Sequence, residues 1–147
     1  MREYQYIVCP IITLLICQVS KFIIESIREG RVDISRLFNG TGGMPSSHTS
    51  FSSSVTMLIG YNLGFHSPIF AVSFVFMLIT AYDAMGLRFE SGKQAEAINL
   101  LFDELRTIKK PKIVFKRLKE RLGHKPLEVL VGLLLGTVVS LCFYLFL

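Results

Sequence analysis

Four long apolar stretches, separated by polar or charged segments, constrain the fold of this chain more than any other feature. They cover about Tyr6–Ile24, Ser47–Phe65, Pro68–Leu87 and Leu127–Leu147. A helix needs roughly 18 or more largely apolar residues to cross a bilayer, and each stretch comes near that length. Hydrophobic residues make up 51% of the 147 residues, and the mean hydropathy of +0.51 is high for a soluble domain. We therefore expect an all-α integral membrane bundle of about four transmembrane helices.

The basic residues are unevenly distributed and predict how the chain lies in the membrane. Four spans would place both termini and the turn at 65–68 on one side, and the loops at 25–46 and 88–126 on the other. Apart from Arg2, every Lys and Arg lies on or near that second side. Short basic loops stay in the cytoplasm, so we expect both loops to face the cytoplasm, in a plasma membrane protein. The net charge of +5 then reflects orientation and contact with anionic lipid, not nucleic-acid binding.

The loop at 88–126 carries helical patterns of its own. Apolar residues recur at helical spacing from Ser91, a candidate N-cap, to Pro111, and a second basic stretch covers Lys112–Leu122. Both are predicted to be amphipathic helices lying at the membrane interface. A solvated helical hairpin packed on the bundle is the alternative. Without internal repeats or low-complexity linkers, the whole of 1–147 is expected to form one domain.

A polar, glycine-rich run, Gly42–His48, opens directly onto the second apolar stretch. It contains two glycines, Pro45, two serines and His48. The first turn of a helix has backbone N–H groups without an intrahelical acceptor. A helix that starts here would therefore offer N–H groups, hydroxyls and a titratable imidazole to an oxyanion. Capping, or an interfacial hydrogen bond, is the alternative role of His48.

A second histidine lies just before the last apolar stretch, in Gly123-His124-Lys125-Pro126-Leu127-Glu128. Pro126 suits the first turn of a helix, and Glu128 lies four residues after His124, so its carboxylate can reach the imidazole. A carboxylate on one ring nitrogen fixes the tautomer and leaves the other nitrogen as a nucleophile or base. Both histidines are predicted on the same side, where two helix N-termini would direct their positive ends. A helix-end position among the headgroups is the alternative for His124.

Ionisable residues within the spans, or at their ends, complete the set of candidates. Lys21 and Arg28 lie seven residues apart, about two helical turns along one face, and could present two cations to a phosphate. Snorkelling to the interface is the alternative for Lys21. Asp83 and Arg88 lie near the end of the third stretch, either as a structural ion pair or with Arg88 as a phosphate ligand held by Asp83. Lys93, just beyond, is a further candidate.

In combination, these motifs resemble the type 2 phosphatidic acid phosphatase and vanadium haloperoxidase superfamily, whose pattern is K-x6-R-P, P-S-G-H and S-R-x5-H-x3-D. Lys21-x6-Arg28 matches the first motif, with Glu29 in place of its Pro. Pro45-Ser46-Ser47-His48 matches the second, with Ser47 in place of Gly, and His124-x3-Glu128 matches the end of the third, with Glu in place of Asp. The strings GGMPSSH, YDAMGLR, GKQAE and LGHKPLEVLVG are similar to a divergent membrane branch of that superfamily, over nearly the whole chain.

The resemblance implies a phosphatase that needs no metal or other cofactor. His124 would attack phosphorus to form a phosphohistidine, Glu128 would orient it, and His48 would protonate the leaving alkoxide. Cations and hydrogen-bond donors would neutralise the phosphoryl oxygens: Lys21, Arg28, Ser46 and the backbone N–H of Ser47. The expected activity is hydrolysis of a phosphate monoester or diphosphate on a lipid or isoprenoid substrate.

Two departures from the superfamily pattern keep other functions open. The third-motif arginine should lie six residues before His124, where this chain has Leu118, although Arg88 could replace it. Four spans are also fewer than in the six-helix membrane phosphatases, whose catalytic face is usually extracytoplasmic. A non-hydrolytic binder or transporter of lipid phosphates is the alternative, and a structural membrane subunit is a third hypothesis. A homodimer also stays open, because four short helices enclose little core.

Overall fold

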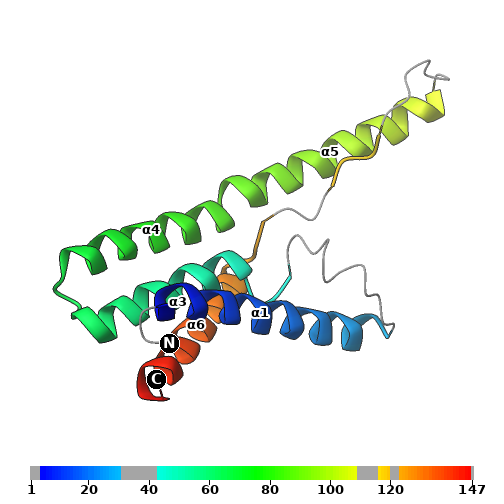
Figure 1. The fold of residues 1–147 in the computed structure, drawn as a ribbon. Coiled ribbons are helices and arrows are strands. Elements are labelled where there is room, and N and C mark those ends of the chain that lie inside the picture. The colour runs from blue at the N-terminus through cyan, green and yellow to red at the C-terminus, as the bar shows by residue number, and fades with distance from the viewer. Residues whose placement is uncertain (1–3, 31–42, 109–115, 120–122, 147) are drawn as a thin grey trace.

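The computed structural model describes residues 4–30, 43–108, 116–119 and 123–146, and all structural statements concern these residues. They form five α-helices: α1 (Gln5–Glu29), α3 (Ser47–Leu63), α4 (Pro68–Met85), α5 (Leu87–Ile108) and α6 (Pro126–Phe146). Four of them, α1, α3, α4 and α6, pack into a bundle, and α5 follows α4 away from it (Figure 1). The predicted all-α class is confirmed.

The helix ends divide the bundle as the alternating spans predict. The start of α1, the turn between α3 and α4 and the end of α6 lie at one end (Figure 1). The end of α1, the start of α3, the end of α4 and the start of α6 lie at the other. Aromatic rings gather at the first end, where Tyr61 lies 5.7 Å from Phe65 and 5.5 Å from Tyr144 between ring centroids. Tyrosines are typical of membrane interfaces; which end faces the cytoplasm stays a prediction.

Three helical runs of the described chain are long and apolar enough to cross a membrane: Gln5–Arg28, Pro68–Leu105 and Pro126–Phe146. The predicted second span corresponds to α3, which has 17 residues, and seven of these are Ser or Thr. Eight residues of α3 are buried. The helices around it expose many large apolar side chains, as a lipid-facing surface requires. The membrane bundle is therefore built around a polar central helix, and the number of four spans stays a prediction.

The packing of α3 on α6 depends on small residues. Gly132, Gly136 and Ser140 recur every four residues along α6, and all three are buried. A Cβ atom on Gly132 would lie 2.7 Å from the carbonyl oxygen of Ser46 and 2.8 Å from Thr49 Oγ1. Only glycine allows the two backbones to approach this closely, and small residues at this spacing are typical of close helix pairs in membranes. This contact, hereafter the seam, fixes the start of α3 against α6.

The hydroxyl groups of α3 find acceptors within the bundle. Ser50 Oγ donates to the carbonyl oxygen of Ser46 at 2.7 Å, and Ser54 Oγ donates to that of Phe51 at 2.8 Å. Thr56 Oγ1 donates across to the carbonyl oxygen of Ser73 on α4 at 3.1 Å. A buried hydroxyl without an acceptor is costly, so these bonds allow a helix rich in Ser and Thr to lie at the centre of an apolar bundle.

The chain after α4 departs partly from the prediction. Gly86 interrupts the helical backbone with φ −93° and ψ −97°, and α5 then begins at Leu87, four residues before the predicted start. Most of the predicted second helix, Lys112–Leu122, lies outside the described residues, and its described part, 116–119, is not helical. The Asn99 side chain accepts from the N–H of Leu118 and donates to its carbonyl oxygen, both at 3.0 Å. These bonds occupy the backbone groups that a helix would pair internally.

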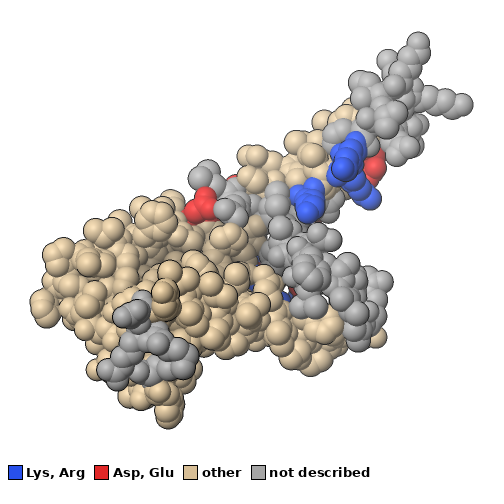
Figure 2. Space-filling model, viewed as in Figure 1, with Lys and Arg blue, Asp and Glu red and all other residues tan. Residues whose placement is uncertain are grey.

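Few charged side chains appear on the face of the bundle that Figure 2 draws. In Figure 2 the bundle face is almost entirely uncharged, whereas blue and red atoms gather over α5 and the segment beside it. One ion pair there joins Arg117 Nη2 to Asp103 Oδ2 at 2.9 Å. This distribution agrees with an apolar part inside the bilayer and a charged part outside it. An interfacial position of α5 stays a prediction.

Candidate functional site

The two motif histidines meet at the end of the bundle where α3 and α6 begin. His48 is the second residue of α3, and His124 lies two residues before α6. Their ring centroids are 6.2 Å apart, with an interplanar angle of 72°. His48 is exposed, whereas His124 is only 5% exposed. The two rings are close enough for both to contact one phosphoryl group, although 76 residues separate them in the sequence.

Backbone contacts fix the position of His124. Its N–H donates to the carbonyl oxygen of Ala84, in the last turn of α4, at 2.9 Å. The preceding Gly123 has φ +82°, a left-handed conformation that glycine adopts without strain. Pro126 occupies the first position of α6, as predicted. The imidazole is thus carried by a short turn anchored to two helices.

The described side-chain contact of Glu128 is with the backbone. Its Oε2 atom accepts from the backbone N–H of Lys125 at 3.1 Å. A Glu at the third helical position commonly caps the helix start in this way. The carbonyl oxygen of Glu128 also accepts from the N–H of Ser46 at 2.9 Å, which ties the start of α6 to the start of α3. Its role in orienting the His124 ring stays a prediction.

Lys21 reaches the site from the interior of α1. Its ammonium group donates to Ser47 Oγ at 2.7 Å, and the residue is only 5% exposed. The carboxylates of Glu25 and Glu128 lie within electrostatic range of it. A buried ammonium group is retained only where hydrogen bonds and opposite charge compensate its lost hydration. Lys21 is therefore directed at the start of α3. The snorkelling alternative would require its side chain to extend to the membrane interface instead.

Ser46, the N-cap residue of α3, has a hydroxyl group in an unusual situation. The residue is fully buried, and its Oγ atom has no hydrogen-bond partner among the described residues. An N-cap serine normally accepts from an N–H of the first helical turn, but Ser46 makes no such bond. A buried polar group without a partner costs about 1–3 kcal/mol. Such a group is expected where a ligand supplies the missing partner.

The loop that leads into α3 rests on α1. Cys17 Sγ donates to the carbonyl oxygen of Pro45 at 3.4 Å. Gly43 has φ +86°, and a Cβ atom there would lie 2.7 Å from Glu25 Oε1, so this position also requires glycine. The Met44–Pro45 peptide bond is cis, and Pro45 precedes the N-cap rather than taking the first helical position. The helix α3 therefore begins after a serine N-cap, with Pro45 outside it.

Other predicted site residues lie around this group without a described contact to it. Arg28 is exposed and lies about two turns beyond Lys21 on α1. Asp83 is half-buried and directly precedes Ala84, whose carbonyl oxygen holds His124. Arg88 belongs to the first turn of α5, but its side chain lies outside the described residues. Their predicted roles stay predictions.

Lys93 is engaged elsewhere. Its ammonium group bonds Glu90 Oε1 at 2.9 Å, on an exposed surface of α5, and lies 4.7 Å above the centre of the Phe89 ring. An exposed ion pair of this kind contributes little to the stability of the fold. The described contacts of Lys93 therefore connect it to α5 and not to the histidines.

Leu118, which occupies the position of the third-motif arginine, is also bonded to α5 and not to the histidines. Leu118 is 41% exposed and is held against α5 through Asn99. Its neighbour Arg117 bonds Asp103 at 2.9 Å, and Arg121 lies outside the described residues. Among the described residues, Lys21 is the cation in contact with the first turn of α3.

Sequence reasoning missed a groove of about 480 Å³ that opens beside His48. It is lined by residues of α1, α3 and α4: Leu14, Gln18, Ser47, His48, Phe51, Ser52, Val55, Phe76 and Thr80. Apart from Ser47 and His48, the lining residues were not predicted, because neutral residues of these types also suit a lipid-facing helix. Their spacing was an available signal, since Gln18 and Leu14 share a helical face with Lys21, and Phe51 and Val55 share one with Ser47.

These contacts define what the site can do chemically. A cation, a buried hydroxyl and the start of a helix lie at the same end of the bundle as two imidazoles. The first set suits the oxygens of an oxyanion, and the second can supply a nucleophile and a proton donor. Among the described residues, no group of three or more His, Cys, Asp or Glu is placed to hold a metal ion.

Comparisons with known proteins agree with the sequence motifs. The family model described as the Divergent PAP2 family matches residues 3–139. The chain is also 39% identical, over 137 residues, to the Bacillus subtilis (strain 168) protein named Uncharacterized membrane protein YuiD. That similarity covers 87% of this chain and 86% of the relative. No solved structure matches the chain. Because the family model and the relative each cover most of its length, the chain belongs to the Divergent PAP2 family.

Proposed function

We propose that this protein hydrolyses a phosphate monoester or diphosphate carried by a lipid or isoprenoid substrate, at the cytoplasmic face of the membrane. One observation carries the proposal: the rings of His48 and His124 lie 6.2 Å apart beside a buried cation that contacts the first turn of α3. Membership of the Divergent PAP2 family supports a phosphatase-like site. The basic residues near this end of the bundle favour a cytoplasmic orientation.

The first part of the proposal is how the phosphoryl group is held. Lys21 Nζ, Ser46 Oγ and the N–H of Ser47 would contact its nonbridging oxygens. Charge spreads over these oxygens in the transition state, so fixed positive charge and donors accelerate the reaction. Lys21 and Ser46 are buried, and electrostatic interactions are stronger there than in water.

The second part assigns the two imidazoles. A ring nitrogen of His124 attacks phosphorus while the bond from phosphorus to the leaving oxygen breaks, and His48 gives that oxygen a proton. Water then attacks the phosphohistidine, His48 takes up a proton from the water, and the P–N bond breaks to release phosphate. Burial and the hydrogen bond to Ala84 suit His124 to the nucleophile. Exposure to the groove suits His48 to proton exchange with the leaving group.

Phosphate release by the purified protein in lipid nanodiscs tests this assignment. The comparison is between wild type, His124→Ala, His48→Ala and His66→Ala, since His66 is exposed in the turn between α3 and α4, at the opposite end of the bundle. We expect the first two variants to lose at least about 100-fold in kcat/KM, as removal of a nucleophile or general acid does, and His66→Ala to match wild type. Equal rates in all four proteins would reject the enzyme assignment.

A non-hydrolytic lipid-phosphate binder or transporter is the second candidate, and a specific observation favours it. The third-motif arginine position carries Leu118, and the adjacent Arg117 is paired with Asp103. A site lacking this cation would bind phosphate with less stabilisation of the transition state. Stabilisation of the fold by orthovanadate or a lipid phosphate, with no phosphate release, would identify a binder. Absence of both effects would indicate a structural subunit.

A further inference from the structure

We infer that a continuous groove along α3 and α4 binds the hydrocarbon tail of the substrate, so that the substrate is a phosphate carried on one extended chain. The inference rests on the proposed phosphate site and adds the class of molecule that it accepts. Its basis is two adjoining cavities, the chemistry of their walls and their continuity with His48.

The first cavity begins at the phosphate site itself. Ser47 and His48 line one end of the 480 Å³ groove described above. Phe51, Val55 and Phe76 line it further along the helices. A ligand whose phosphate lies between the imidazoles therefore has its next atoms at the opening of an apolar channel.

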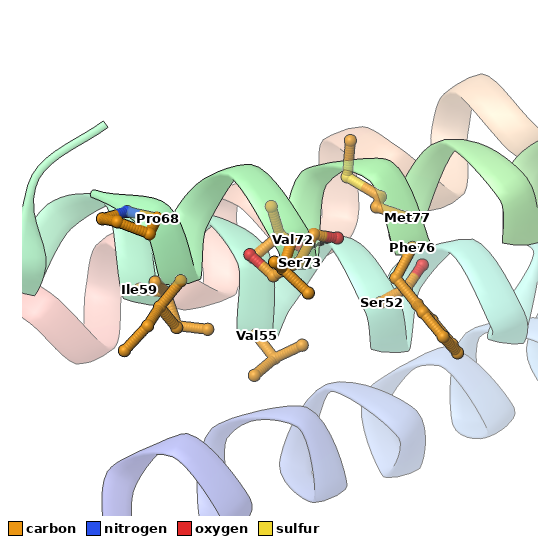
Figure 3. A pocket seen from close by; sticks show the side chains of 10 residues that line it. Ser52, Val55, Ile59, Pro68, Val72, Ser73, Phe76 and Met77 are labelled. Carbon is orange, nitrogen blue, oxygen red and sulfur yellow. Dashed lines mark hydrogen bonds between the residues drawn. The ribbon is translucent and has the colours of Figure 1, made fainter. Parts of the chain in front are cut away.

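A second cavity of about 460 Å³ continues in the same direction. Its lining comes from α3 and α4: Ser52, Val55, Thr56, Ile59, Pro68, Ile69, Val72, Ser73, Phe76 and Met77. Ser52, Val55 and Phe76 line both cavities, so the two adjoin at these three side chains. Figure 3 shows its side chains following one another from Phe76 to Pro68, next to the turn between α3 and α4.

The polar atoms of the second cavity are already bonded to protein groups. Thr56 Oγ1 donates to the carbonyl oxygen of Ser73 at 3.1 Å, and Ser52 Oγ donates to that of Thr49 at 3.3 Å. Ser73 Oγ donates to the carbonyl oxygen of Phe70 at 2.9 Å. With these hydroxyls engaged and the remaining walls aliphatic or aromatic, the groove suits methylene groups and not a polar headgroup.

The course of the groove along two facing helices suits one extended chain. Its α3 wall consists of Ser52, Val55, Thr56 and Ile59, which lie on a single face of that helix. One face of α4 forms the opposite wall. The groove therefore follows one face of each helix, and a single extended chain lying along that path would contact both walls.

The groove also opens laterally. Val72 and Phe76 line it, and both are 69% exposed. In a membrane these side chains face lipid, so a substrate can reach the groove without leaving the bilayer. Its phosphate would then lie at the histidine end and its tail would extend into the hydrocarbon region.

A chain-length comparison in nanodiscs tests the inference. The substrates are straight-chain alkyl phosphates of increasing length, a polyprenyl phosphate of matched length and a two-chain phosphatidic acid. Val72→Trp narrows the groove at an exposed position, where folding is little affected, and Val75→Trp is the control because Val75 is 55% exposed on the same helix and does not line either cavity. We expect kcat/KM to rise with chain length in wild type and in the control.

In Val72→Trp, the ratio of kcat/KM for a long chain to that for a short chain should fall by about tenfold or more. A misfit in an apolar pocket causes a loss of this size. An alkyl phosphate with a terminal diazirine should label Ile59 and Val72 in wild type, in competition with unlabelled alkyl phosphate. Comparison of the alkyl phosphates with the polyprenyl phosphate shows whether the groove prefers a straight hydrocarbon chain or an isoprenoid chain. Faster turnover of phosphatidic acid than of every single-chain phosphate would overturn the inference.

The inference and the proposed function fail in different ways. Phosphate release without chain-length preference, or labelling spread over α1 and α6, would overturn the tail groove and leave the phosphatase intact. Labelling of the groove that is equal for the alkyl phosphate and the corresponding alcohol, with no phosphate release, would overturn both. A crosslink between two protein chains at Val72 would replace the tail by a second copy as the occupant.

Discussion

The two sides of α3 pack against their neighbours in opposite ways. Towards α6, Gly132 and Gly136 bring the backbones so close that an added Cβ atom meets Ser46, Thr49 or Ser50. Towards α4, the same helix leaves a groove of about 460 Å³. Small residues in the seam hold the start of α3 closely against α6, whereas larger apolar residues on the α4 side leave room for a ligand. At the start of α3, Ser46 lies against Gly132 in the seam, and Ser47 and His48 line the adjoining groove of about 480 Å³.

Lys21→Met should have the largest effect, because it removes the cation while keeping the length and apolar stem of the side chain. We expect phosphate release to fall by about 100- to 1,000-fold, the usual loss when one stabilising donor is removed from a transition state. Stabilisation by orthovanadate in a thermal unfolding assay should disappear as well. Lys125→Met is the control, since Lys125 is an exposed lysine at the same end of the bundle. A rate close to wild type in Lys21→Met would remove Lys21 from the site.

Gly132→Ala should break the seam without replacing any proposed site residue. The new methyl group would meet the Ser46 carbonyl oxygen at 2.7 Å, so α3 has to shift. Overpacking of this kind costs about 1–3 kcal/mol of stability, and a shift near 1 Å costs roughly 100-fold in rate. Thermal unfolding measures the loss of stability, and phosphate release measures the loss of rate. The control is Leu134→Ala, at a 57% exposed position of α6. Unchanged stability and rate would mean that the seam does not fix the site.

Ser46→Ala should give the smallest change, with opposite signs for stability and binding. The Oγ atom has no described partner, so its removal should leave stability unchanged or raise it by about 1 kcal/mol. Binding of orthovanadate should weaken about tenfold, as expected for one lost hydrogen bond to an anion.

Ser50→Ala provides the contrast, because Ser50 Oγ bonds the Ser46 carbonyl oxygen at 2.7 Å and its loss should lower stability. Thermal unfolding with and without orthovanadate measures both quantities. Destabilisation by Ser46→Ala with unchanged binding would show a purely structural role for its hydroxyl.

The core of the candidate site could be predicted from the sequence. Alternating spans place the start of the second and fourth stretches at one end, and that topology alone brings His48 near His124. Lys21 follows from the same argument, since it lies toward that end of the first span. The motif positions and the membrane topology are thus two independent signals for one arrangement.

Other features could not be predicted, because each depends on a contact that the local pattern does not specify. Hydropathy identifies apolar helices but does not show which of them lies at the centre of the bundle, as α3 does. The i, i+4 spacing of His124 and Glu128 fits an imidazole contact, yet a Glu three residues into a helix also caps it, as Glu128 does through Lys125. The backbone of Leu118 is set by Asn99, 19 residues earlier.

The proposed nucleophile, acid and cation come from three separate stretches of chain: His124 before α6, His48 on α3 and Lys21 on α1. During synthesis α6, the last of these helices in the chain, enters the membrane only after α1 and α3 are in place. A partly inserted chain would therefore be chemically silent towards the lipids around it. Turnover would begin only when the final helix docks, so enzymatic activity would report complete assembly in a way that the presence of individual helices does not.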